Sequence, residues 1–119
     1  MKLKKVVTIF GAGSWGTAIA KNISENGYKV RIWAKEKSVV NSIIKTRENK
    51  EFLPGVKLPS LIYPTYSLDK ELFDSDFLIF SIPTQFIRES LLTMKEMISK
   101  DSILINTSKG IEQSSMKPI

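Results

Sequence analysis

Three closely spaced glycines offer the clearest chemistry in the chain. Residues 11–16 read GAGSWG, the G-x-G-x-x-G spacing of loops that hold the pyrophosphate of a dinucleotide. In that pattern Gly11 permits a tight turn, Gly13 lets the backbone approach a phosphate, and Gly16 lets the next helix pack closely. The helix N-terminus would add unpaired N–H groups and a partial positive charge. We therefore predict a dinucleotide site; a strand–turn–helix corner that binds nothing is the alternative.

Charged residues near the end of the second predicted strand bear on which dinucleotide is bound. Glu36 follows the turn at about the 20-residue spacing at which an acidic residue bonds the adenosine ribose in such sites. Lys35 and Arg31 supply positive charge where the 2′-phosphate of NADP would lie. The cofactor is therefore predicted to be NAD or NADP, and the sequence favours neither.

Lys109, just after the last predicted strand, is a further candidate. Beside a nicotinamide ring, a lysine at the carboxyl end of a strand would stabilise a developing alkoxide; a solvated loop lysine is the alternative. Histidine and cysteine are both absent, which removes the commonest general base, the thiolate nucleophile and the usual metal ligands. No metal site is predicted.

Alternating strands and helices are expected to position these residues. Short apolar runs predict strands, and apolar residues at helical spacing predict helices. Strands are predicted at residues 5–10, 28–33, 61–66, 76–82 and 102–106, a turn at residues 11–16, and helices at residues 17–25, 38–48 and from Pro83 to about residue 98. Because these strands are too apolar to have a wet face, we expect an α/β, Rossmann-type doubly wound parallel sheet with helices on both faces. Any ligand should lie at the carboxyl ends of the strands.

Length and composition predict one domain over residues 1–119. Apolar residues make up 42% and charged residues 25%, as in ordinary globular proteins. No apolar run approaches the ~20 residues of a membrane span, and the first one is too short for a signal peptide, so a cytoplasmic location without membrane insertion is expected. The net charge of +6 permits nucleic-acid binding, but no recognition motif is visible and no such partner is predicted.

Four segments together resemble the amino-terminal domain of the glycerol-3-phosphate dehydrogenase family. They are the turn with Trp15 inside it and GTA after it, the loop NKEFLPGVKLP at residues 49–59, SIPTQ at residues 81–85 and SKGIE at residues 108–112. Their order and spacing are more specific than the glycines alone, and the likeness runs over residues 6–112. Phe52 departs from the pattern, since the family often has tyrosine there.

The resemblance implies an enzyme that interconverts sn-glycerol 3-phosphate and dihydroxyacetone phosphate with NAD or NADP, for glycerophospholipid synthesis. It implies that Ser14, Trp15 and Lys35 contact the cofactor, beside the three glycines. Lys109 would lie where cofactor and substrate meet and would bind both. The family's general base is a lysine of a later helical domain. We therefore expect the chain to stop before that domain, to hold no catalytic residue and to be inactive alone, and we expect any homodimer to form through the missing domain.

Two other interpretations remain open at this point. A different dehydrogenase of the same superfamily, such as a ketopantoate reductase or a 6-phosphogluconate-type enzyme, would share the fold and the glycines, although the tryptophan in the turn and the SKG motif argue against it. A free-standing dinucleotide-sensing module would bind the cofactor without chemistry. The coding sequence beyond Ile119 would distinguish that module from an enzyme.

Overall fold

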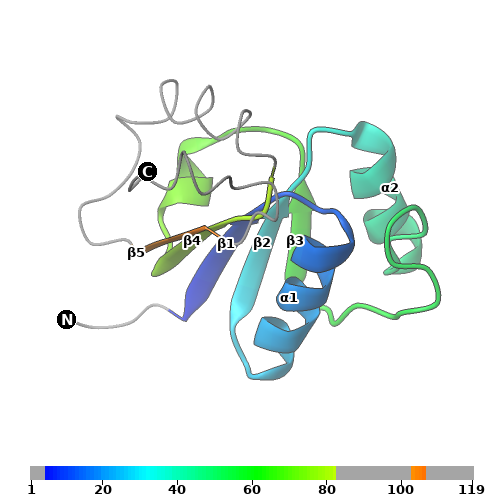
Figure 1. Cartoon of the computed structure of the whole chain (residues 1–119), viewed down its shortest axis with the longest axis horizontal. Coiled ribbons are helices and arrows are strands. Elements are labelled where there is room, and N and C mark those ends of the chain that lie inside the picture. Colours follow the sequence, from blue (N-terminus) through cyan, green and yellow to red (C-terminus); the bar gives the residue numbers. More distant parts are fainter. Residues whose placement is uncertain (1–4, 83–102, 107–119) are drawn as a thin grey trace, which may run out of the picture.

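Five parallel strands form one sheet in the order β3-β2-β1-β4-β5 (Figure 1). The computed structural model describes residues 5–82 and 103–106. In chain order the elements are β1 (Val6–Phe10), α1 (Ser14–Glu25), β2 (Lys29–Trp33), α2 (Lys37–Thr46), β3 (Ile62–Thr65), the 3-10 helix η1 (Lys70–Phe73), β4 (Phe77–Phe80) and β5 (Ile103–Asn106). From β1 the chain first moves outward through β2 and β3, then returns to place β4 on the other side of β1. The predicted Rossmann-type doubly wound sheet is confirmed.

Most predicted elements are present, and the differences concern the start of one helix and one short helix that was not predicted. All five strands lie within two residues of the predicted limits, and α2 does as well. The predicted turn at residues 11–16 was wrong in its second half, because α1 already begins at Ser14 with Gly13 as its N-cap. The short helix η1 was not predicted. The helix predicted from Pro83 lies outside the described residues.

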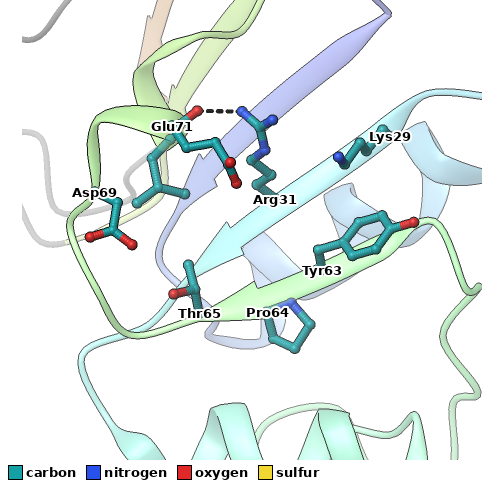
Figure 2. A pocket seen from close by; sticks show the side chains of 8 residues that line it. Lys29, Arg31, Tyr63, Pro64, Thr65, Asp69 and Glu71 are labelled. Carbon is teal, nitrogen blue, oxygen red and sulfur yellow. Dashed lines mark hydrogen bonds between the residues drawn. The ribbon is translucent and has the colours of Figure 1, made fainter.

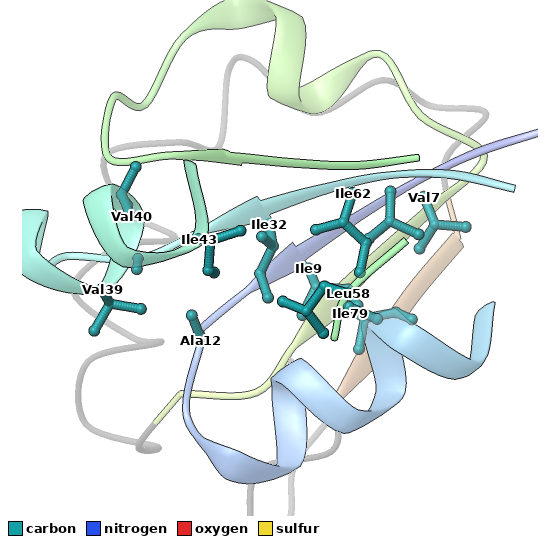
Figure 3. Packing of buried hydrophobic residues seen from close by; sticks show 13 residues of the cluster. Val7, Ile9, Ala12, Ile32, Val39, Val40, Ile43, Leu58, Ile62 and Ile79 are labelled. Carbon is teal, nitrogen blue, oxygen red and sulfur yellow. The ribbon is translucent and has the colours of Figure 1, made fainter. Parts of the chain in front are cut away.

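One face of the sheet packs against α1 and α2. Alternate residues of each strand point to this face, as the two-residue period of a strand requires. Figure 3 shows Ile9, Ile32 and Ile79 from the strands meeting Ile43 of α2 and Leu58 of the following loop. The buried members of this cluster are Val7, Ile9, Ala12, Ala20, Val30, Ile32, Ala34, Val39, Val40, Ile43, Leu58, Ile62 and Ile79. These contacts fix the positions of both helices on the sheet.

Aromatic side chains fill the second face around β1 and β4. The ring of Phe10 stacks on that of Phe80 with centroids 4.9 Å apart, and Phe73 of η1 lies 5.4 Å from Phe10. In the middle of β1, the Thr8 hydroxyl lies 2.6 Å from the Ser75 hydroxyl and donates to the Leu72 carbonyl. These contacts hold η1 against the sheet.

The second face is open to solvent beside β2 and β3, so the expectation that no strand has a wet face was wrong there. A small pocket of about 170 Å³ lies among polar side chains of both strands and the η1 segment (Figure 2). Arg31 donates to the Glu71 carbonyl, and the Lys29 ammonium lies 4.8 Å from the Tyr63 ring centroid. Alternate residues of β2 are charged, and β3 is the last strand at that side. This part of the sheet therefore has one apolar and one polar face.

Adjacent isoleucines in α2 test the burial that holds this helix. The Ile43 side chain is fully buried, whereas Ile44 is 58% exposed. We expect Ile43→Ala to lower the free energy of unfolding by ~2–5 kcal/mol, because it leaves a cavity. Ile44→Ala makes the same change in helix propensity and should shift that free energy by less than ~0.5 kcal/mol. Urea unfolding of both variants measures the difference, and equal losses would contradict the packing.

Candidate functional site

A cleft of about 500 Å³ opens at the carboxyl ends of β1, β2 and β4. Main-chain hydrogen bonds hold the three strand ends together: the Gly11 N–H donates to the Trp33 carbonyl and the Ser81 N–H to the Phe10 carbonyl, both at 2.8 Å. The lining residues are Gly11, Ala12, Gly13, Trp33, Ala34, Lys35, Glu36, Phe52, Ser81 and Ile82. This edge of the sheet is where ligands of doubly wound folds bind.

Two of the glycines are required by the packing of the main chain. Gly11 has φ +119°, and a Cβ there would lie 2.2 Å from the Ser81 carbonyl oxygen. A Cβ on Gly16 would lie 2.2 Å from the Gly11 carbonyl oxygen. Both distances are far below van der Waals contact, and both opposing atoms belong to the backbone. These two glycines therefore let the ends of β1 and β4 and the first turn of α1 come into direct contact.

Gly13 differs, because nothing within the fold explains it. Its φ is −76°, which any residue adopts, and apart from its own chain neighbours no atom of the described residues lies within 4 Å of the Cβ position. It lines the cleft at the N-terminus of α1, where the first helical N–H groups lack helical acceptors. The first turn of α1 contains no acidic residue that would repel an anion. The open space and the donors together suit a phosphate group.

Opposite charges follow the end of β2. Lys35 and Glu36 are both exposed and line the cleft, and the Ala34 N–H donates to the Thr65 carbonyl at 3.0 Å. Arg31, expected to share this place with Lys35, points to the second face instead, where its guanidinium donates to the Glu71 carbonyl (Figure 2). It also donates to the Asp74 carbonyl. Lys35 is thus the cation that the described residues place in this cleft.

The comparison with known families decides what kind of domain carries this cleft. Residues 6–119 match the family described as the N-terminus of NAD-dependent glycerol-3-phosphate dehydrogenase. The chain belongs to this family. It is 42% identical over 113 residues to the glycerol-3-phosphate dehydrogenase [NAD(P)+] of Bacillus mycoides, covering 95% of this chain and 33% of that protein. The corresponding Bacillus subtilis protein is 40% identical over 112 residues, covering 94% of this chain and 32% of that protein.

Solved structures give the same assignment. Glycerol-3-phosphate dehydrogenase from Coxiella burnetii superimposes with a TM-score of 0.81 at 27% identity, covering 92% of this chain and 34% of that one. The Saccharomyces cerevisiae enzyme gives 0.78 at 31% identity, covering 89% and 34%. The chain thus spans about a third of the length of the glycerol-3-phosphate dehydrogenases that it matches. Membership of this family sets aside the ketopantoate reductase and 6-phosphogluconate-type alternatives.

The structure brings together some of the residues that were predicted to bind the cofactor in this glycerol-3-phosphate dehydrogenase domain. Gly11, Gly13 and Lys35 line the cleft, whereas Gly16 is buried behind the turn. Ser14 and Trp15 form the exposed start of α1, and 56% of the Trp15 surface is accessible. Lys109 lies outside the described residues.

Sequence reasoning did not assign the apolar wall of the cleft. Trp33, Phe52 and Ile82 line it together with Ser81. A signal was available for three of these residues, because residues at and just beyond the carboxyl ends of parallel strands line the ligand crevice in this class of fold. Phe52 had no such signal, because it comes from the loop after α2. Among the residues that the structure describes, no group of three or more potential metal ligands occurs, and no helix is long and apolar enough to cross a membrane.

A comparison of two glycine substitutions tests these assignments. We expect Gly16→Ala to lower the free energy of unfolding by ~1–3 kcal/mol, because the added methyl group meets the Gly11 carbonyl. Gly13→Ser should leave it unchanged or slightly raised, since the site is open and serine is a favoured N-cap. Thermal unfolding of both variants, without cofactor, provides the measurement. Equal destabilisation would show that Gly13 also serves the fold.

Proposed function

We propose that this chain binds NAD or NADP for a glycerol-3-phosphate dehydrogenase that interconverts sn-glycerol 3-phosphate and dihydroxyacetone phosphate. Family membership supports the reaction, since the relatives are glycerol-3-phosphate dehydrogenases [NAD(P)+]. The observation that carries the binding proposal is the open corner at Gly13, beside the unpaired N–H groups of α1. In a cell, this reaction would provide the glycerol phosphate backbone of phospholipids, in the cytoplasm.

Each part of the cleft suits one part of the cofactor. The pyrophosphate would lie over Gly13, where the N-terminus of α1 offers donors and a partial positive charge, with Ser14 and Trp15 at its edge. The adenosine ribose would lie at Lys35 and Glu36, after β2. Trp33, Phe52 and Ile82 would exclude water from the cofactor's apolar surfaces. When bound, the cofactor supplies the hydride acceptor or donor of the reaction.

The substrate end of the reaction needs residues beyond the described part of the chain. We assign Lys109 the position between cofactor and substrate, where an ammonium group would stabilise developing negative charge on the substrate oxygen. A general base, which typically contributes 10²–10⁴-fold, would come from the part of the relatives beyond the third that this chain matches. A homodimer contact would also belong to that region. We therefore expect the 119-residue chain to bind cofactor without turnover.

Cofactor binding by this chain is testable through its melting temperature. With NADH at about 100 times its dissociation constant, binding to the folded state adds ~2.7 kcal/mol. For a domain of this size, the melting temperature should rise by roughly 10 °C or more. Reduction of dihydroxyacetone phosphate, followed by loss of NADH absorbance, should remain undetectable. Turnover by the chain alone would contradict the assignment of the general base to another part of the relatives, and a folded sample without a thermal shift would contradict the dinucleotide site.

Two substitutions at Gly13 provide the control for that shift. Gly13→Asp should fold, because aspartate is a favoured N-cap and no described atom obstructs its Cβ, but its carboxylate would occupy the space of the phosphate and repel it. The NADH-dependent shift should therefore disappear. Gly13→Asn adds the same volume without the charge and should lose less of the shift. An undiminished shift in Gly13→Asp would place the pyrophosphate elsewhere.

The role of Lys35 in cofactor preference gives a separate prediction. In a partly exposed site, one charge contact with the 2′-phosphate should contribute ~1 kcal/mol and weaken as salt rises. Lys35→Glu should therefore lower the affinity for NADPH more than that for NADH, as measured by calorimetry at low salt. Lys45→Glu makes the same charge reversal at the other end of α2 and should leave the ratio unchanged. An unchanged ratio in Lys35→Glu would mean that another group faces the phosphate.

A further inference from the structure

A single buried amide joins the glycine turn to the loop after α2. The Asn49 side chain is fully buried, and its Nδ2 donates to the Ala12 carbonyl at 2.8 Å and to the Thr17 hydroxyl at 2.9 Å. Its Oδ1 accepts the Phe52 N–H at 3.1 Å. Both N–H groups and the oxygen of the amide are therefore used. These bonds connect the turn, the first helical turn of α1 and the loop that carries Phe52.

The bond to Ala12 has a consequence on the other side of the same peptide group. The described backbone contains no cis peptide bond, so the Ala12 carbonyl and the Gly13 N–H point in opposite directions within one plane. When Asn49 holds the carbonyl on the buried side of the turn, the Gly13 N–H must point away from the loop. No acceptor for that N–H lies among the described residues, and both Ala12 and Gly13 line the cleft.

We propose that Asn49 is a positioning residue for the cofactor: it holds the Ala12 carbonyl so that the Gly13 N–H faces the pyrophosphate. The inference rests on the proposed function, because it requires a phosphate over Gly13. Asn49 touches no part of the cofactor itself and acts through the orientation of one peptide group. Without it, that peptide can rotate, and the donor is no longer preorganised for the anion.

The side chain at position 49 must donate hydrogen bonds and must also accept one. Leucine has the same branching as asparagine and is somewhat larger, but it can neither donate nor accept a hydrogen bond. An ionised carboxylate still accepts from Phe52 but cannot donate to the Ala12 carbonyl, whereas a protonated carboxyl can donate again. None of the three partners of Asn49 titrates, since they are a carbonyl, a hydroxyl and a backbone N–H. The variant Asn49→Asp therefore makes the bond to Ala12 depend on pH.

The experiment measures NADH affinity and melting temperature for the 119-residue chain and its variants. Asn49→Leu should weaken NADH binding roughly tenfold, a factor equivalent to ~1.4 kcal/mol. Asn49→Asp should bind weakly at pH 8 and recover as the pH falls and the introduced carboxyl is protonated; burial raises the pKa of such a group, which brings the recovery into an accessible range. The wild type should show no such recovery over the same pH range.

A matched control separates positioning from a general loss of stability. Ser75 is buried and hydrogen-bonded to Thr8 at the opposite end of the sheet, so Ser75→Ala should lower the melting temperature without changing NADH affinity. Wild-type affinity in folded Asn49→Leu, or an Asn49→Asp affinity that does not follow pH, would overturn the proposal. If neither variant folded, Asn49 would be a residue of the fold and the positioning role would also be overturned. If the wild type itself bound no NADH, the proposed function would fail instead.

Discussion

The direct contact of main chain at the end of β1 decides how the rest of the structure is arranged. Gly16 lies so close to the Gly11 carbonyl that a Cβ would stand 2.2 Å from it, and Gly11 in turn lies against the Ser81 carbonyl after β4. This contact brings the N-terminus of α1 between the two central strands. The partial positive charge at the N-terminus of α1 is therefore directed at the carboxyl ends of β1 and β4. From these two strands the sheet extends to β3 on one side and to β5 on the other. Gly13 then stands at the open corner, free for a ligand.

The segment between α2 and β3 has a matching role on the outer side of the cleft. It begins where Arg47 ends α2 with a left-handed φ of 57°, and the Arg47 guanidinium donates to the carbonyls of Pro59 and Ile62. The loop therefore returns to the sheet at a fixed place. Asn49 then anchors it to the turn, so that Phe52 lines the cleft. Thus a loop without regular structure is positioned by a few buried polar groups.

What the sequence could predict follows from the range of the interactions involved. The strands were predictable because apolar, β-branched runs such as residues 6–10 are local signals of burial. The start of α1 was not, because a glycine that can be a turn residue can equally be an N-cap. The direction in which the Arg31 side chain points depends on carbonyl acceptors 40 and 43 residues away in the sequence. The position of the Asn49 amide depends on hydrogen-bond partners 37 and 32 residues away. Such pairings are set by tertiary packing, for which a single sequence contains no local pattern.

Of the basic side chains in the described part of the chain, only Lys35 lines the cleft. In the described part, Arg31 is bound to carbonyls of the η1 segment, Lys29 lies over Tyr63, and Lys21 pairs with Glu25 at 2.7 Å. The cleft itself contains Lys35 beside Glu36, two opposite charges. Recognition of a pyrophosphate by these residues, as proposed, would therefore depend on oriented N–H groups and a helix terminus. Packing fixes such donors, so they lose no side-chain freedom when an anion binds. The buried contacts behind the turn therefore matter more for this site than the net charge of +6.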